Sequence, residues 1–589
     1  MMRGIPMPPS RSCSLLLITA FAATFASAQE IAFPADARAV IDVKRDCGAK
    51  GDGVADDTQA LQSAIERAGG NDYSRSIYLP SGTYKISRTL ILKPPGDGKE
   101  GAMVGPWLWG QNRAKTVIRL ADGAEGFGDP QKPREAIRGV SRPDGAKMNA
   151  DFFDRTIANL TIDTGRNPGA VAIKFYSNNT GLMQNVLVRG SGACGIDLGF
   201  NDQNGPCLLQ DVEVEGFAVG IRTDHIINSQ TLSRVTIRGA GQVGLLHRGQ
   251  VLAVEGLRVL DSPVAVDSGG NGVLVLVDSQ LQAPAGGAAA AGPAIKLEKG
   301  RLYAARVTTQ GFASTIAAAA GIPGGNAAGP NVAEYSSHGV EVLGPGTPKA
   351  GLGLKPPREP DVPMPTKAED WVCANDFGAK AGDEDDDAPA FQEAVDEAAR
   401  KGASTVYLLG GKRGDPNWYW MKKDVRVHGS VRRVMGFGFV RILGGSSKEP
   451  TYPEIPRLET HPMIVNGMIL FARRHLLVGL PEDRIGHVSA QANGEFSTKP
   501  FAMPAADLLL NAALPLPDRP FAEDHAYVMG AFPDEKGAII PGFEGEERSE
   551  RSDIHETERL FFPQSVSADH GIGGAGAGGV SVARPWCQR

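Results

Sequence analysis

The stretch CGAKGDGVADDTQALQSAIERA runs from Cys47 to Ala68, and FGAKAGDEDDDAPAFQEAVDEA runs from Phe377 to Ala398. The two stretches align without a gap at a constant offset of 330 residues. In each of them apolar residues recur three and four positions apart, which is the spacing of one face of a helix. We therefore predict amphipathic helices over 57–68 and 387–400.

Paired aspartates precede both predicted helices. Asp56, with Gln59 three residues later, has the form of a capping box, in which side chains bond to free backbone N–H groups at a helix start. A strand-like segment follows each helix, over 76–84 in the first copy and over 404–411 in the second. The repeated unit is therefore loop, helix and strand, and we expect its aspartates to be structural rather than catalytic.

Short β-type runs recur between the two copies. They begin 26, 26, 23 and 22 residues apart, at Asn159, Asn185, Asp211, Arg234 and Gly256, and a second strand follows in each unit. This period predicts a parallel β-solenoid, in which each coil buries its apolar side chains against its neighbours. An amphipathic helix would cover the open end of such a stack, so two copies predict two solenoids. We expect the column that begins with Asn159 to form hydrogen bonds from coil to coil.

The phrase GAKGDGVADDTQALQSAI, followed by YLPSGTYKIS, resembles the opening of the pectate-lyase-superfamily domain found in rhamnogalacturonase- and epimerase-like right-handed β-helices. The doubling resembles the tandem β-helix exo-β-1,3-glucanases of glycoside hydrolase family 55. The resemblance covers residues 38–342 and 371–445. It implies a right-handed parallel β-helix with an N-terminal capping helix, followed by a second, incomplete β-helix.

The remaining segments complete the predicted domain organisation. Residues 1–28 have the basic start, short apolar run and small-residue ending of a secretory signal. The first β-helix domain is expected over 29–343, a linker rich in proline and glycine over 344–370, and the start of the second domain over 371–445. Residues 446–589 show no coil repeat. They could form a divergent accessory domain or a disordered tail, or result from a reading-frame error, which we favour because the composition changes abruptly.

Charge and cysteine content narrow the functional classes. A net charge of -6 argues against nucleic acid and anionic membrane as partners, because both attract basic surfaces. We expect a secreted or periplasmic monomer once the signal is removed. Cys194 and Cys207 lie close enough in sequence to pair, although buried free thiols are an equal alternative. No CxxC motif or Cys/His cluster suggests zinc.

Aligning the second strands of successive coils produces two columns of side chains. The outward strand position holds Lys174, Asp197, Arg222, Leu246, Ala265 and Lys296, which we interpret as a surface charge ladder. The turn just beyond holds Asn178, Asp202, Asp224 with His225, His247 with Arg248, Asp267 and Glu298. Acid, imidazole and guanidinium groups are densest in this turn column.

Asp202 and Asp224 are the candidate catalytic residues. On adjacent coils their carboxyl groups would be about 5 Å apart, which suits a retaining glycosidase, whereas a sideways offset would leave room for water and inversion. Like charges this close raise one pKa and so supply a general acid beside an ionised partner. Turn aspartates are also favoured for purely structural reasons. The candidate substrate-binding residues are Arg222, His225, His247 and Asp267.

These residues and the resemblance together predict a secreted glycoside hydrolase acting on a β-glucan or a pectin-type polysaccharide. One alternative is pectate-lyase-type elimination, which would require calcium. Another is a carbohydrate-binding β-helix without catalysis. For the hydrolase we predict no metal and no cofactor, and the sequence leaves the sugar, the linkage and the stereochemistry open.

Overall fold

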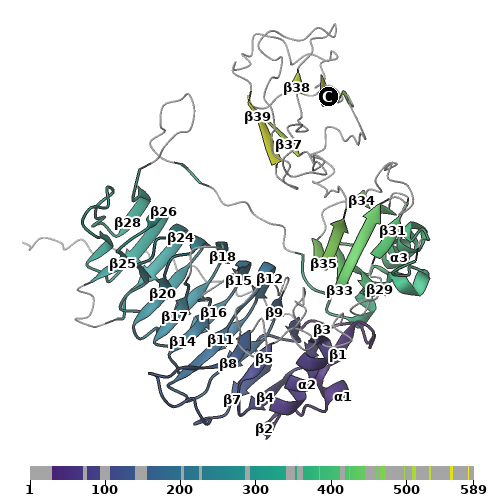
Figure 1. Ribbon diagram of the computed structural model, residues 1–589, viewed down its shortest axis with the longest axis horizontal. Coiled ribbons are helices and arrows are strands. Elements are labelled where there is room, and N and C mark those ends of the chain that lie inside the picture. Colours follow the sequence, from purple (N-terminus) through teal and green to yellow (C-terminus); the bar gives the residue numbers. More distant parts are fainter. Residues whose placement is uncertain are drawn as a thin grey trace, which may run out of the picture.

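The computed structural model describes most of the chain up to residue 444 (Figure 1). The signal segment predicted at 1–28 and most of the linker predicted at 344–370 lie outside the described residues. The described ranges are 30–69, 76–92, 107–139, 155–199, 205–224, 229–285, 292–339, 352–354, 362–383, 385–410, 418–422, 425–444 and seven short strands after residue 457.

The first unit begins with a small cap. It consists of β1 (Val40–Asp42), α1 (Val43–Cys47), β2 (Asp52–Asp56) and α2 (Thr58–Gly69). The helix expected over 57–68 is α2. Its apolar positions Leu61, Ala64, Ile65 and Ala68 are all buried in the core of this unit. The spacing that predicted the helix is therefore the spacing of its packed face.

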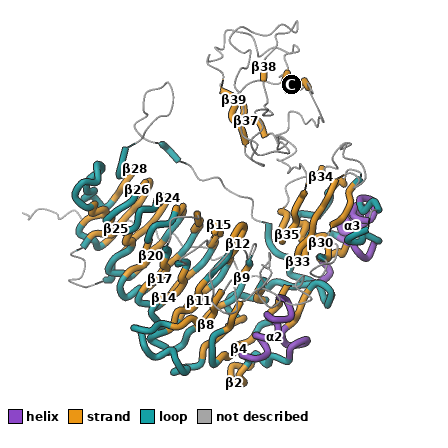
Figure 2. Tube along the Cα trace, viewed as in Figure 1, coloured by secondary structure: helices purple, strands orange, loops and turns teal. Residues whose placement is uncertain are grey.

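Three rows of stacked strands follow the cap (Figure 2). Every pairing within the rows is parallel. The first row is β3 (Ser76–Leu79), β6 (Leu108–Gly110), β9 (Thr156–Ala158), β12 (Asn178–Gln184), β15 (Gly205–Gln210), β18 (Ser229–Ser233) and β21 (Val251–Glu255). The second row is β4 (Gly82–Ile86), β7 (Thr116–Leu120), β10 (Thr161–Asp163), β13 (Leu187–Arg189), β16 (Glu213–Glu215), β19 (Thr236–Arg238) and β22 (Arg258–Leu260). The third row is β5 (Leu90–Leu92), β8 (Arg134–Gly139), β11 (Ala170–Lys174), β14 (Cys194–Asp197), β17 (Val219–Arg222), β20 (Val243–His247), β23 (Val266–Ser268), β25 (Pro293–Leu297) and β27 (Ser314–Ala318).

The far end of the stack differs from the middle. β24 (Val273–Gln282) and β26 (Arg301–Gln310) each pass through both the first and the second row. β28 (Asn331–Ser336) pairs antiparallel with β26 and so ends the parallel stacking. The predicted fold class is confirmed, because coils of three short strands stacked in parallel form a parallel β-helix.

A left-handed turn joins the first row to the second in four successive coils. Asn159, Asn185, Asp211 and Arg234 all have φ between +51° and +58°. The Asn185 amide donates to Asn159 Oδ1 at 2.6 Å, and the Asn159 amide donates to the Gly110 carbonyl at 2.9 Å. The expected coil-to-coil bonding is confirmed at these asparagines, whose side chains tolerate this conformation and bond locally.

Alternation along the strands fills the core. Ile162, Val188, Val214 and Ile237 are the central residues of β10, β13, β16 and β19, and all four are buried. Their flanking neighbours point outward because successive side chains of a strand lie on opposite faces. Each buried aliphatic side chain stabilises the coil by about 1.5–3 kcal/mol.

A second unit repeats the start of the first. It contains η2 (Ala368–Asp370), β29 (Trp371–Cys373), η3 (Ala374–Phe377), α3 (Ala388–Lys401), β30 (Thr405–Leu409), β31 (Trp418–Met421), β32 (Val425–Arg426), β33 (Arg433–Gly444), β34 (Leu458–Glu459) and β35 (Ile464–Ala472). The helix expected over 387–400 is α3. The β29–β30–β33 pairings are parallel, as are those of β33 with β31 and β35.

The last strands pair differently. They are β36 (Phe496–Ser497), β37 (Asp507–Asn511), β38 (Gly530–Ala531), β39 (Thr557–Phe561) and β40 (Ser581–Val582), and every pairing described among them is antiparallel. Parallel stacking is described only up to β35 in this part of the chain.

The repeated aspartates hold the loop before each helix. Asp57 Oδ1 accepts a hydrogen bond from the Lys50 amide at 2.6 Å, and Asp387 Oδ1 accepts one from the Lys380 amide at 2.7 Å. The capping box expected for Asp56 and Gln59 does not form in the first copy. Asp56 Oδ1 does accept from the Thr58 amide at 2.9 Å, but Gln59 instead accepts from the Arg88 guanidinium at 3.0 Å, because that group lies within its reach.

The repeated glutamines join each helix to the coil beside it. Gln62 accepts from the Ile91 amide at 3.0 Å and donates to the Ile91 carbonyl at 3.1 Å. Gln392 makes the same two bonds to Arg426, at 2.7 Å and 3.0 Å. The matching residues of the two stretches therefore have matching structural roles.

An aromatic cluster joins the two units. Phe33 stacks on Trp371 with ring centroids 5.3 Å apart, and lies 5.7 Å from Trp109 and 6.1 Å from Phe437. The Trp371 indole donates to the Ala32 carbonyl at 2.7 Å. The segment before β1 is therefore packed between β6 of the first unit and β29 and β33 of the second.

Candidate functional site

The third row presents a column of charged side chains on its outer face. Strand register places one residue from each of six successive strands in the column, namely Lys174, Asp197, Arg222, Leu246, Asp267 and Lys296. The predicted column had Ala265 where the structure has Asp267. Ala265 is buried before β23 begins, because the turn ahead of this strand is longer than the sequence alignment assumed.

A buried carboxylate anchors the middle of the column. Asp197 is only 3% exposed and accepts bonds from Arg222 Nε at 3.0 Å and Arg222 Nη2 at 2.5 Å. It also accepts from the Gly199 amide at 2.8 Å, and Lys174 Nζ lies 3.8 Å away. The hydrogen bonds to Asp197 raise the pKa of Arg222, whose side chain is still 45% exposed. Arg222 is therefore a fixed cation that faces solvent.

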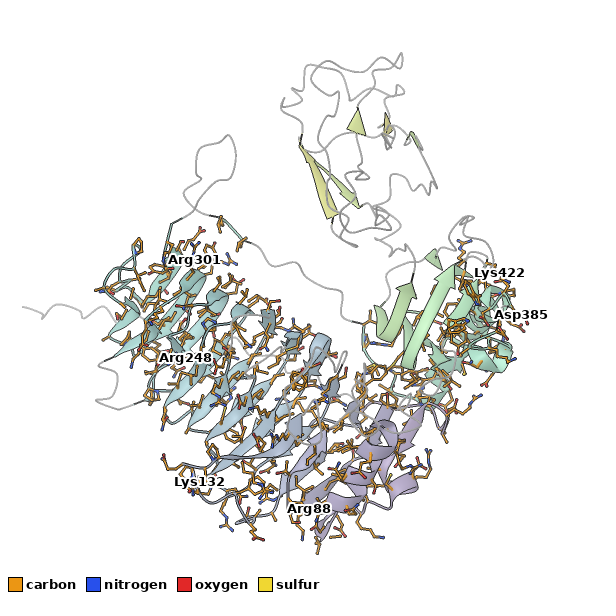
Figure 3. All side chains as sticks on the ribbon, in the orientation of Figure 1. Arg88, Lys132, Arg248, Arg301, Asp385 and Lys422 are labelled. Carbon is orange, nitrogen blue, oxygen red and sulfur yellow. The ribbon has the colours of Figure 1, made fainter. Side chains whose placement is uncertain are left out.

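A second ion pair lies two strands further along. Arg248, labelled in Figure 3, donates from Nη1 to Asp267 Oδ1 at 2.8 Å and to the His247 carbonyl at 3.0 Å. Asp267 is the more buried partner, at 15% exposure against 33% for Arg248. In both pairs the aspartate is the more buried partner and the arginine is the more exposed one. Among the ion-paired groups described on this face, it is the cations that meet solvent.

His247 does not reach this outer face. Its ring is fully buried, with Nδ1 2.9 Å from Ser268 Oγ and Nε2 2.7 Å from the Gln250 carbonyl. Burial lowers the pKa of His247, so its ring is neutral and its polar atoms are satisfied inside the coil. The predicted role of His247 in substrate binding is wrong for this reason.

Asp224 is the described member of the predicted catalytic pair. It follows β17, is exposed, and lies near enough to Arg222 to help raise the pKa of that guanidinium. Among the described residues no hydrogen bond to its carboxylate is found. Asp202 and His225 lie outside the described residues, so the distance between the two aspartates is not measured and their catalytic roles stay predictions.

The second row carries another charged cluster, which the sequence analysis did not identify. Glu213 and Glu215 stand on the outer face of β16, and Arg238 Nε donates to Glu213 at 2.8 Å. Arg113 reaches the other Glu213 oxygen at 2.7 Å from the turn after β6. The signal was present in the sequence. When the strands of the second row are aligned, Glu215 falls between the arginines that end LVR (187–189) and TIR (236–238).

Neither a disulfide bond nor a metal site is found among the described cysteines and acidic residues. Cys194 and Cys207 are buried and free, so they do not form the disulfide that was one alternative. Within the described ranges no group of three His, Cys, Asp or Glu side chains could hold a metal ion. No helix of the described chain has the length and apolar character needed to cross a membrane.

The first unit is similar in sequence to known proteins. Residues 40–267 match the family model described as rhamnogalacturonase A/epimerase, pectate lyase-like. Alginate lyase 7 of Azotobacter vinelandii is 35% identical over 126 residues, which are 20% of this chain and 12% of that protein. Mannuronan C5-epimerase AlgE4 of the same organism is 34% identical over 125 residues, 21% of this chain and 19% of that protein.

A glucanase is also similar to this chain. Glucan 1,3-beta-glucosidase of Cochliobolus carbonum is 29% identical over 177 residues, 30% of this chain and 19% of that protein. The solved A-module of AlgE4 superposes with a TM-score of 0.22 at 16% identity, covering 47% of this chain and 88% of that chain. The alignments span only 12–19% of the length of the three curated relatives. Residues 40–267 of this chain are therefore similar to the rhamnogalacturonase A/epimerase, pectate lyase-like family.

Proposed function

We propose that the chain is a secreted enzyme that cleaves a polysaccharide by hydrolysis on the outer face of the third row. The observation that carries this proposal is the column of charged side chains in strand register, with the exposed carboxylate of Asp224 beside the fixed guanidinium of Arg222. The family match and the polysaccharide-acting names of the relatives support the same class of substrate.

The geometry of the stack suits a linear polymer. Neighbouring strands lie about 4.8 Å apart, so the six strands from β11 to β25 extend over about 24 Å. A sugar chain along this direction would meet Lys174, Arg222 and Arg248 in turn. Their ion pairs hold these cations in place, which reduces the entropy lost when a ligand binds.

Hydrolysis needs two carboxyl groups with different roles. One donates a proton to the glycosidic oxygen, and the other attacks the sugar or activates a water molecule. We assign these roles to Asp224 and Asp202, with Arg222 orienting the substrate. The assignment does not depend on a metal ion.

A second candidate reaction is β-elimination from a uronic acid. The outward cations favour it, because a guanidinium that pairs with the sugar carboxylate makes the neighbouring C–H proton easier for a base to remove. This reaction would involve calcium if it follows the pectate-lyase type. The same face could also bind glycans without turnover.

Product analysis separates these functions. The full chain is incubated with β-1,3-glucan, polygalacturonate, rhamnogalacturonan and alginate, with and without a chelator. New reducing ends without unsaturation, insensitive to the chelator, support hydrolysis, whereas unsaturated uronides support elimination. Glycan retention without any product supports a binding protein.

A matched pair of variants tests the site. Asp224→Asn should lower turnover at least 100-fold, because general acid–base groups contribute about 10²–10⁴-fold. Asp211→Asn is the control, since Asp211 is an exposed aspartate paired to Arg234 in a turn that asparagine tolerates. Full activity in Asp224→Asn would refute the site assignment.

A further inference from the structure

The second row carries an alternating column of charges. Strand register aligns one residue from each of five neighbouring strands, β7, β10, β13, β16 and β19, and these are Arg119, Asp163, Arg189, Glu215 and Arg238. Asp163 Oδ2 accepts from Arg119 Nη1 at 3.1 Å and from Arg189 Nε at 3.0 Å. The arginines therefore occupy every second strand, with an acid between each pair.

Two of these arginines keep part of their guanidinium group available. Arg189 donates to Asp163 through Nε, and Arg238 donates to Glu213 through Nε. Across the described strands of this row no hydrogen bond from the Nη groups of either arginine is found. Arg306, in contrast, uses both Nε and Nη2 on Asp278. Arg189 is 46% exposed and Arg306 43%, so the two differ in bonding rather than in exposure.

Glu215 stands between the two available guanidinium groups. It faces Arg189 of β13 and Arg238 of β19, and Glu213 lies two residues earlier on the same face of β16. Burial, and then the charge of Glu213, raise the pKa of Glu215 above its ordinary value. Burial also opposes ionisation of Glu213, but bonds and charges from Arg238 and Arg113 outweigh it and hold the pKa of Glu213 low.

We propose that Arg189, Glu215 and Arg238 form a second binding site for a carboxylated polysaccharide, separate from the third-row site. The two arginines are two strands apart, about 9.6 Å, so they would bind two carboxylates of one chain that lies along the stack. Each guanidinium can offer a bidentate fork to a carboxylate. The choice of polysaccharide as the ligand rests on the proposed function.

The position of Glu215 makes this binding depend on pH. A ligand carboxylate near Glu215 is repelled by the ionised side chain and accepts a hydrogen bond from the protonated one. Affinity should therefore rise as the pH falls, by up to about tenfold per pH unit for uptake of one proton. Asp163 stays paired with Arg189, and Glu213 with Arg113 and Arg238, so Glu215 is the acid of this cluster expected to take up the proton.

Calorimetric titration of the full chain with oligogalacturonate tests the site. The titrations are made in an Asp224→Asn background, which should lower turnover at least 100-fold, at pH 5 and pH 7. Arg189→Ala and Arg238→Ala should each weaken binding about tenfold, as expected for loss of a charge-assisted contact. Arg306→Ala should leave the affinity unchanged. Glu215→Gln should strengthen binding at pH 7 and remove the pH dependence.

The outcomes separate this site from the proposed catalytic one. Unchanged binding in both Arg189→Ala and Arg238→Ala, or equal affinity for a sulfated polymer that lacks carboxylates, would overturn the second site. Normal turnover in these two variants, measured with Asp224 intact, leaves the third-row site untouched. Binding that depends on Arg189 and Arg238 in a chain that cleaves none of the polymers would overturn the proposed function and retain this site.

Discussion

Replacing Asp57 with alanine would remove the two hydrogen bonds that hold the loop before α2. The Asp57 carboxylate is buried and accepts from the Lys50 amide at 2.6 Å and from the Gly51 amide at 2.8 Å. Without it, two part-buried amide groups lose their acceptor. Each such group costs about 1–3 kcal/mol, so the substitution should weaken the capping region by about 2–6 kcal/mol.

Asp52 supplies a matched control in the same loop. It also accepts from two backbone amides, those of Val54 and Ala55, both at 2.8 Å, but its side chain is exposed. Water can replace the lost acceptor there. Asp52→Ala should therefore cost less than about 1 kcal/mol, although it removes the same number of hydrogen bonds.

Native-state amide exchange is the suitable assay, because it reports the local opening of one loop rather than the unfolding of the whole chain. Exchange at Lys50, Gly51 and the first turn of α2 should become much faster in Asp57→Ala and hardly change in Asp52→Ala. Equal effects of the two substitutions would refute the reasoning, since burial would then not decide the cost. A change spread evenly over all coils would also contradict it.

Three further predictions concern the coil turns, the junction and the second cap. Asn159→Ala should lower the urea midpoint of the first unit and reduce its free energy of unfolding by about 2–4 kcal/mol. The substitution loses the side-chain hydrogen bonds to Gly110 and Asn185 and places alanine at a positive φ. Asn159→Gly should recover about 1 kcal/mol, because glycine adopts this φ without strain. Phe33→Ala should weaken the junction by about 3–5 kcal/mol and separate the calorimetric transitions of the two units, whereas a single unchanged transition would contradict the packing. Burial raises the pKa of Asp387 to about 6, so the stability contributed by its protonated form is complete below about pH 4 and is lost as the pH rises through 6. Amide exchange at Lys380, corrected for intrinsic rates, should therefore be faster at pH 7 than at pH 5. Asp387→Asn should make this exchange less dependent on pH.

Much of the fold could be predicted because its signals are local. The helical spacing in 57–68 and 387–400 and the coil starts at Asn159, Asn185 and Asp211 depend on residues close together in the chain. Side-chain alternation then assigns inward and outward positions without any knowledge of distant contacts. The family resemblance rests on the same local phrase, which is why it is confirmed over residues 40–267.

The chemistry of the surface depended on register between coils. Asp267 occupies the strand column in place of Ala265, two residues earlier. His247 directly follows the outward residue Leu246 in β20, so its side chain points to the opposite, buried face beside Ser268. A sequence column cannot resolve such shifts, because loops of different length bring residues of different spacing to the same strand position.

Contacts between residues far apart in the chain could not be predicted from the sequence. Arg113 binds Glu213 across 100 residues, and Phe33 stacks on Trp371 across an even longer separation. Periodicity showed that the chain winds into coils and where each capping helix begins, because those properties repeat along it. Which charges meet on a face, and how the two units join, was decided only when the coils stacked, because that juxtaposition belongs to three-dimensional packing and not to any single segment.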